Sequence, residues 1–376
     1  MANPRNNSIN FSSGSALLQV EIQMDMKGNG LSSLLYCKAP IKLRQEEEAV
    51  LKHERIALMA FSASVLFGQV FHLKEMNTRQ LRSLDRSKTV VLLPIGILEQ
   101  HGPYMPSFTD GYAAERHTLD IASAIVERPG WQALIFPTIP LGSSAANEIG
   151  GKFSFDGSYT VRTGTLRSIL MDLGTELGEG GFRWIFVIHP HGGGGGALNN
   201  SRAVDQACDY FGDTYGGHMV NLLKLVVDRT PEDRKKLRNI LGDEGFCPHA
   251  CGSEIARSLY LHPQLVDPGF KSAPAHQVRN WTEAAQAAQR DGWQGYFGAP
   301  AAGTAWAGAQ LFRLQSQWLA DLALRILDGF DYSTLPRYSD VFAKNAEITT
   351  INSAALEHED RVEKRQSEWL RKRGLK

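Results

Sequence analysis

The stretch VVLLPIGILEQHGPYMPSFTD, residues 90–110, constrains this 376-residue chain more than any other. A continuous apolar run ends near a glycine, and Glu99, His101 and Asp110 then follow within twelve positions. Glu99 and His101 are spaced i, i+2, so an extended backbone places both side chains on one face. Carboxylate and imidazole groups are common ligands of divalent metals. The stretch therefore predicts a buried strand that ends in part of a metal site.

Apolar runs alternate with helical patterns along the middle of the chain. Continuous apolar runs, typical of strands buried on both faces, cover residues 89–93, 133–137 and 184–188. Helices are expected over residues 76–84, 109–126, 165–178, 197–211, 254–263 and 309–327, and residues 220–227 fit a strand or a short helix. Thr109 or Asp110 and, further on, Ser253 are the expected N-caps. This order predicts an α/β fold with three layers (αβα) and a central, mostly parallel sheet.

The chain is expected to have three parts. Residues 1–74 form an N-terminal extension, residues 75–330 the central domain, and residues 331–376 a charged, helical C-terminal extension. Within the first part, residues 1–50 have no sustained period and are expected to form a loosely attached tail. Residues 52–71 have the basic start and apolar run of a signal peptide, but they lie internally. A cytoplasmic protein is expected, with export as the alternative if this segment acts as a signal.

Charge and cysteine content exclude several classes of partner and site. Forty basic residues balance forty acidic ones, so neither nucleic acid nor a membrane surface is an expected partner, and a small-molecule substrate fits better. Four cysteines are too few for a disulfide framework, which favours a reducing compartment. Cys247, His249 and Cys251 form a C-x-H-x-C pattern, but a structural zinc site needs a second ligand pair, and none follows.

The loop HPHGGGGG, residues 189–196, follows the third apolar run. One interpretation is a phosphate-binding glycine loop, although the Lys-Ser/Thr pair of a P-loop is missing. The other is that His191 binds a metal and the glycines let the backbone and a substrate approach it closely. The metal interpretation is favoured because it also explains the histidine.

A third polar set, HACGSE at residues 249–254, precedes a helix. Glu254 alone could simply stabilise the helix N-terminus. However, two histidines and three carboxylates now lie at strand ends or helix starts on one edge of the predicted sheet: Glu99, His101, Asp110, His191 and Glu254. This set suits two divalent ions with a bridging carboxylate, which can lower the pKa of a water toward 7. His249 is the best placed proton shuttle, and no nucleophile motif competes.

Three motifs resemble those of the creatininase, or creatinine amidohydrolase, family. PIGILEQHGPYMPSFTD (94–110) matches P-x-G-s-x-E-Q-H-G-p-h-L-P-x-x-T-D, HPHGG (189–193) matches N-G-H-G-G, and HACGSE (249–254) matches H-A-G-x-x-E. The resemblance implies a parallel α/β fold, a homo-oligomer that is often a hexamer, and cleavage of amide C–N bonds in small or cyclic substrates. It also implies two divalent ions, with Asp110 as the bridge and His249 as the catalytic acid or base. Zn²⁺ is the expected metal, and Mn²⁺ or Fe²⁺ are alternatives.

Several positions depart from the family pattern. His189 and Pro190 replace Asn-Gly, Cys251 replaces a glycine, and Gly193 stands where creatininase itself has a glutamate. The chain is therefore not expected to be a creatininase in the strict sense. His189 could be an additional ligand or a residue that supports the ligands from behind. Tyr104, which replaces a histidine, and Gly192 and Gly193 are candidates for the substrate pocket.

Three functions follow from these patterns. The first is a metal-dependent hydrolase that cleaves a C–N amide bond in a small cyclic or linear amide. The second keeps the metal but acts on a cyclic polyol ketone of the inosose kind, as a hydrolase or ring-opening enzyme. The third is a non-catalytic nucleotide-binding or scaffold protein with a degenerate metal site.

Overall fold

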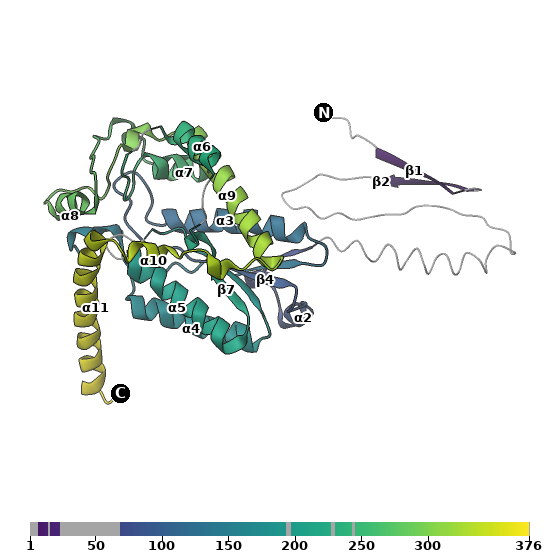
Figure 1. Cartoon of the computed structure of the whole chain (residues 1–376), viewed down its shortest axis with the longest axis horizontal. Coiled ribbons are helices and arrows are strands. Elements are labelled where there is room, and N and C mark those ends of the chain that lie inside the picture. Colours follow the sequence, from purple (N-terminus) through teal and green to yellow (C-terminus); the bar gives the residue numbers. More distant parts are fainter. Residues whose placement is uncertain are drawn as a thin grey trace. The chain divides into compact units, whose positions relative to one another are not determined.

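The computed structural model describes residues 7–13, 16–22, 68–192, 197–226, 230–242 and 245–375. Backbone contacts divide the chain into two units, residues 1–65 and residues 66–376. In the first unit, strands β1 (Asn7–Ser13) and β2 (Ala16–Ile22) pair antiparallel (Figure 1). No regular period was expected in this part of the chain, but the sequences of both strands contain short stretches that alternate apolar and polar residues, as strands do. The signal-like segment 52–71 lies outside the described residues, apart from its last four.

The second unit is built on a five-stranded, fully parallel sheet in the order β3-β5-β4-β6-β7. Its strands are β3 (Val70–His72), β4 (Thr89–Pro94), β5 (Gln132–Ile135), β6 (Trp184–Ile188) and β7 (His218–Asn221). The predicted α/β fold with a parallel sheet is confirmed. The two strands at the edges are short, and β3 lies before residue 75, where the central domain was expected to start.

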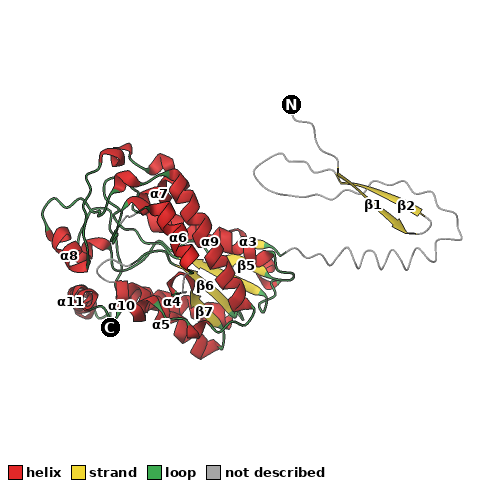
Figure 2. Ribbon diagram, turned by 45° about the horizontal axis from the view of Figure 1, so that its top comes forward, coloured by secondary structure: helices red, strands yellow, loops and turns green. Residues whose placement is uncertain are grey.

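Helices cover both faces of this sheet (Figure 2). On β4, Val90 and Leu92 pack into one buried cluster with α3 (Thr109–Val126) and α9 (Ala305–Leu327). Val91 and Leu93 point the other way and pack with α4 (Thr163–Glu179) and α5 (Ala197–Tyr215). Because successive side chains of a strand alternate between faces, one apolar run supplies both cores. Each such side chain contributes about 1.5–3 kcal/mol when it is fully buried.

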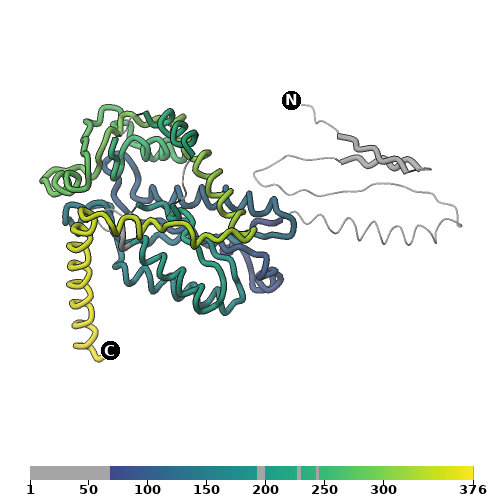
Figure 3. Tube along the Cα trace, viewed as in Figure 1, coloured from purple at the N-terminus to yellow at the C-terminus, as the bar shows by residue number. Residues whose placement is uncertain are grey.

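The remaining helices connect or cover this core. They are α2 (Thr78–Arg82), α6 (Pro231–Leu241), α7 (Gly252–Leu261), α8 (Trp281–Gln289), α10 (Tyr338–Phe342) and α11 (Ala346–Lys372). The C-terminal segment runs from α9 back along the domain and ends in α11 (Figure 3). Thr163 at the start of α4 donates two hydrogen bonds to Glu359 of α11, so this helix is tied to the domain. Among the described residues, no helix is long and apolar enough to cross a membrane.

Two of the expected N-caps are wrong by one or two residues. Helix α3 begins at Thr109 with Phe108 as its N-cap, and α7 begins at Gly252 with Cys251 as its N-cap. The Cys251 carbonyl already accepts hydrogen bonds from the backbone N–H groups of Glu254 and Ile255, so helical turns start before Ser253. Each helix therefore begins earlier than side-chain capping preferences suggest, and the candidate ligands Asp110 and Glu254 both fall in a first turn.

Candidate metal centre

The candidate ligands converge at the carboxyl edge of β4 and β6. Three groups of three residues each have ligand atoms within 4.8 Å of one another. One is Glu99, His101 and His249; the other two are Glu99, Asp110 and His191, and His101, Asp110 and Glu254. Asp110 belongs to both of these last two groups. Asp110 reaches this position because the backbone just past β4 approaches α3 closely. A Cβ on Gly96 would lie only 2.7 Å from the Cα of Gly111 in α3, so a glycine is needed there. Two adjoining ligand groups that share one carboxylate form an arrangement suited to two ions and a bridge.

His191 is oriented by hydrogen bonds on both sides of its ring. Its Nδ1 lies 3.1 Å from Glu99 Oε2 and 3.1 Å from Asp110 Oδ2. Its Nε2–H points to the carbonyl oxygens of Ser143 and Ser144, at 3.2 and 3.1 Å. Ser144 has a φ of 68°, a conformation that costs a residue other than glycine about 1–2 kcal/mol. A ligating histidine commonly donates its other N–H to a backbone carbonyl in this way, so Nδ1 is the atom that could bind a metal.

Two buried atoms in this cluster have no hydrogen bond. Glu99 Oε1 accepts from the backbone N–H of Ala146 at 2.5 Å, and His101 Nδ1–H donates to the Glu99 carbonyl at 3.0 Å. Glu99 Oε2 and His101 Nε2 have no hydrogen-bond partner among the described residues, although Oε2 lies within ion-pair distance of His191. An unsatisfied buried polar group costs about 1–3 kcal/mol. Divalent cations at the two ligand groups that share Asp110 would coordinate these atoms, so the residues present fit a metal.

The charges of the cluster are strongly coupled. Burial raises the pKa of the Asp110 carboxyl, but the hydrogen bond from His191 and the neighbouring histidines outweigh it, and the pKa is lowered. Burial lowers the pKa of His191, but Glu99 and Asp110 outweigh it and raise that pKa well above its ordinary value. The same carboxylates that favour a proton on His191 would favour a metal ion in its place. Metal binding is therefore expected to release a proton here.

His249 faces the cluster with one ring nitrogen. Its Nε2–H donates to the Gln100 carbonyl at 2.6 Å, which leaves the Nδ1 lone pair 4.0 Å from Glu99 Oε1. Burial lowers the pKa of His249, so the ring is neutral near pH 7. Cys247 and Cys251 are joined by a disulfide across this turn, so the C-x-H-x-C pattern offers no free thiolates to a metal. His249 could take up a proton at Nδ1 without losing its hydrogen bond to Gln100.

His189 lies behind the cluster. Its Nδ1 is 3.1 Å from the Ile95 carbonyl, and its Nε2 is 2.8 Å from the Asn200 amide nitrogen. Burial lowers the pKa of His189 to about 3, so the ring is neutral. Asn200 also lies 3.3 Å from the backbone nitrogen of Ser143. Both ring nitrogens of His189 are thus occupied, and this geometry favours a supporting role over that of an additional ligand.

The three residues expected in the substrate pocket are placed less clearly. Tyr104 packs against an apolar cluster that includes Phe270 and Tyr296. Gly192 is exposed, and a Cβ there would meet nothing within 4 Å. Gly193 lies outside the described residues. Their role in a pocket stays a prediction.

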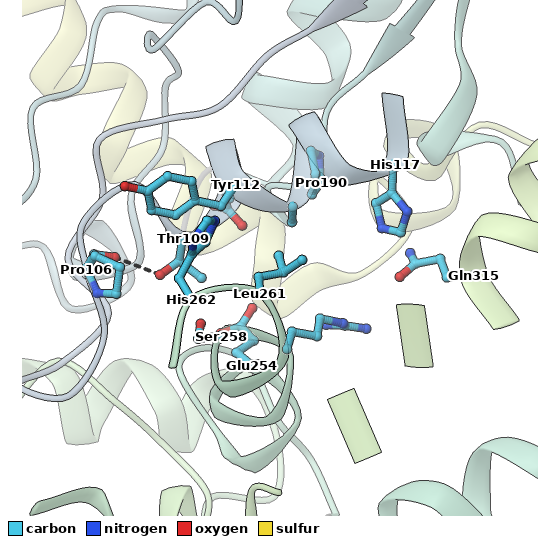
Figure 4. Close-up of a pocket in the computed structure, with 13 residues that line it drawn as sticks. Pro106, Thr109, Tyr112, His117, Pro190, Glu254, Ser258, Leu261, His262 and Gln315 are labelled. Carbon is cyan, nitrogen blue, oxygen red and sulfur yellow. Dashed lines mark hydrogen bonds between the residues drawn. The ribbon is translucent and has the colours of Figure 1, made fainter. Parts of the chain in front are cut away.

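A pocket adjoins the cluster where α3 faces α7. Asp110 and Glu254 line it together with other polar side chains: Tyr112, His117, Arg257, His262 and Gln315. Figure 4 shows His117 and Gln315 beside each other at one end and Tyr112 and His262 at the other. These additional residues were not predicted from the sequence. One signal was present, since Arg257 follows Glu254 by three positions and must therefore share its helix face.

His117 makes the stability of the chain depend on pH. Burial, with Arg257 and Arg116 nearby, lowers the pKa of His117 to about 3, while its Nδ1 lies 3.1 Å from Ser316 Oγ. The unfolded chain takes up this proton near pH 6.5, so stability is full above that pH and falls as the pH drops toward 3. Between pH 6.5 and 4.5 the loss from this group is about 2–3 kcal/mol.

Urea unfolding of the metal-free chain at several pH values measures this loss. His117→Gln removes the titration, so its stability is expected to fall less steeply than that of the wild type below pH 6.5. His72→Gln, a change in β3, serves as the control and is expected to keep the wild-type slope. Equal slopes for His117→Gln and wild type would contradict a buried neutral His117.

Fold and cluster together define a class: an α/β protein with a candidate dinuclear metal centre at the carboxyl edge of a parallel sheet. The family model described as creatininase, creatinine amidohydrolase, matches residues 74–323. The chain belongs to the creatininase family. This confirms the resemblance seen in the motifs.

Individual relatives are more distant. The chain is 31 % identical over 127 residues to a mycofactocin precursor peptide peptidase of Mycolicibacterium smegmatis, covering 33 % of this chain and 47 % of the relative. It is 29 % identical over 102 residues to a creatinine amidohydrolase of Pseudomonas putida, covering 27 % and 37 %. The matched regions thus span about half or less of the length of these curated relatives. A solved structure named "Creatininase Mn" shares the fold, with a TM-score of 0.51, 19 % identity and coverage of 69 % and 99 %.

Proposed function

We propose that this chain is a metal-dependent hydrolase that cleaves a C–N amide bond with water. One observation carries the proposal: Asp110 stands between two ligand groups whose atoms converge within 4.8 Å. Membership of the creatininase family supports it. One similar protein is named as a peptide peptidase and another as a creatinine amidohydrolase, and both names are consistent with hydrolysis of a C–N bond.

The candidate ligands would hold two ions. Glu99, Asp110 and His191 would hold one ion, and His101 and Glu254 would hold a second with Asp110. When bound, two divalent ions would polarise the amide carbonyl and lower the pKa of a bound water toward 7. Zn²⁺ is the proposed metal, with Mn²⁺ or Fe²⁺ as alternatives, because a mixed set of imidazoles and carboxylates accepts all three.

His249 would move the proton. Its neutral ring can accept a proton from the attacking water at Nδ1 and donate it to the amide nitrogen as the C–N bond breaks. The water oxygen ends on the carbonyl carbon, and the amine leaves with the proton. Throughout, the hydrogen bond from Nε2–H to the Gln100 carbonyl fixes the ring in place.

We also propose that the chain forms a homo-oligomer, a hexamer as the family resemblance implies. Its proposed substrate is a small molecule or a short peptide.

A substrate panel tests the reaction. Creatinine, simple lactams, formamides, short peptides and inosose-type ketones are incubated with the zinc-loaded chain, with and without chelator. Chelator-sensitive cleavage of an amide in this panel is expected. Turnover of the ketones alone, or of nothing in the panel, would contradict the proposal.

A further inference from the structure

The pocket between α3 and α7 is lined by one positively charged side chain, Arg257, for which the proposed function gives no role. Asp110 and Glu254, both candidate metal ligands, line the pocket with Arg257, His117 and Gln315. The Nε atom of Arg257 is buried and has no hydrogen-bond partner among the described residues. Leaving such a donor unsatisfied costs about 1–3 kcal/mol. Arg257 as a whole is partly exposed and lines the pocket, and a cationic side chain with an unsatisfied donor at the edge of a candidate active site calls for a ligand.

The neighbours of Arg257 do not supply that partner. No carboxylate of the described residues lies within ion-pair distance of Arg257, although Asp110 and Glu254 line the same pocket. His117 is engaged with Ser316, and the Tyr112 ring packs against His262 at a tilt, with ring centroids 4.1 Å apart. Arg257 is the only guanidinium or ammonium group among the residues that line the pocket. Its planar donors match a carboxylate, which they can bind through two parallel hydrogen bonds.

The spacing along α7 relates this cation to the candidate metal centre. Arg257 follows Glu254 by three residues, so both lie on one helix face about 4.5 Å apart along the axis. One residue of an extended peptide spans about 3.3–3.6 Å. A carboxylate held by Arg257 would therefore leave an amide one residue away close to the ligand group of Glu254.

We infer that this pocket is a carboxylate subsite, in which Arg257 binds the free carboxylate of the amino acid that leaves. The substrate class is a short peptide cleaved before its C-terminal residue, or an N-acyl amino acid. This inference rests on the proposed function. In that reaction, water adds to the carbonyl carbon, the C–N bond breaks, and the amino acid leaves with its new N–H while its carboxylate stays paired with Arg257.

The test compares N-acetylglycyl-leucine with its C-terminal amide, which differs only in the charge of the end group. For the zinc-loaded chain, kcat/KM is expected to be about 10–100 times higher for the acid, as a hydrogen-bonded charge pair predicts. Arg257→Gln is expected to abolish this preference through a higher KM for the acid. Arg257→Lys, which keeps the charge but loses the fork of donors, is expected to restore part of the preference.

Arg116→Gln is the matched control, because it removes a cation from α3 that already pairs with Asp120 at 2.9 Å. It is expected to keep the wild-type preference. Calorimetric binding of the two compounds to the metal-free chain gives a readout without catalysis, and there too the acid is expected to bind more tightly only when Arg257 is present. Thermal unfolding shows whether each variant folds.

The outcomes separate this inference from the proposed function. If the wild type cleaves both compounds equally well, or if Arg257→Gln keeps the preference, the subsite is overturned and the hydrolase stands. If the wild type binds the acid through Arg257 but cleaves neither compound nor any other amide, the subsite stands and the hydrolase is overturned. If it neither binds nor cleaves either compound, the subsite is overturned, and the substrate panel decides the hydrolase.

Discussion

Asp110→Ala is expected to lower the metal content of the chain from two ions to fewer than one. Asp110 is the residue common to both ligand groups, so its removal takes one ligand from each at once. It also leaves Glu99 and His191 without the carboxylate that completes their group. Metal analysis after dialysis without chelator measures the loss, and amide cleavage is expected to fall by more than about a thousandfold with it.

Two further variants make this prediction specific. Asp120→Ala removes a carboxylate from the same helix, one that pairs with Arg116 outside the cluster, and is expected to leave both ions bound. Glu254→Gln removes a ligand only from the group that contains His101, so one ion is expected to remain. An Asp110→Ala chain that folds and still holds two ions would refute the bridging role of Asp110.

His249→Ala is expected to keep both ions and to lose about 10²–10⁴ in kcat, the usual contribution of a positioned acid or base. The reason is the orientation of the ring, whose Nε2–H is fixed on Gln100 while Nδ1 faces Glu99 at 4.0 Å. Steady-state kinetics and metal analysis of the same preparation measure the two quantities separately.

The control for this prediction is His218→Ala. His218 stacks on Trp184 at the opposite, amino-terminal ends of β6 and β7, so its removal leaves the candidate centre untouched. Full activity of His249→Ala would exclude the residue from the mechanism. Loss of an ion from that variant would instead make His249 a ligand, since it also forms a group with Glu99 and His101.

The central strands β4 and β6, and the gathering of candidate ligands at their ends, could be predicted from the sequence, whereas β1, β2 and β3 were not predicted. The run at residues 184–188 coincides with β6, and the run at 89–93 is β4 less its last residue. Both are long enough and apolar enough to be buried on two faces, and parallel strands bring their carboxyl ends to one edge. His191 and Asp110, 81 positions apart, therefore had to lie near each other, and they are 3.1 Å apart.

The hydrogen bonds that orient the candidate ligands could not be predicted, because their partners are backbone atoms or residues far away in the sequence. Ser143 and Ser144 orient His191 through their carbonyl oxygens, which no side-chain pattern reveals. His189 was ambiguous from sequence because its two partners, Ile95 and Asn200, are brought to it only by the fold. Arg257 carried a local signal, but a buried donor without a partner becomes visible only once the surrounding helices are in place.

The central claim is that two metal ions share Asp110 as a ligand. Titration of the metal-free chain with Zn²⁺, followed by calorimetry and checked by metal analysis, measures this directly. Two tightly bound equivalents per chain are expected, with protons released on binding as His191 loses its shared proton. Saturation at one equivalent would contradict the dinuclear centre, and no binding at all would contradict the metal-dependent hydrolase.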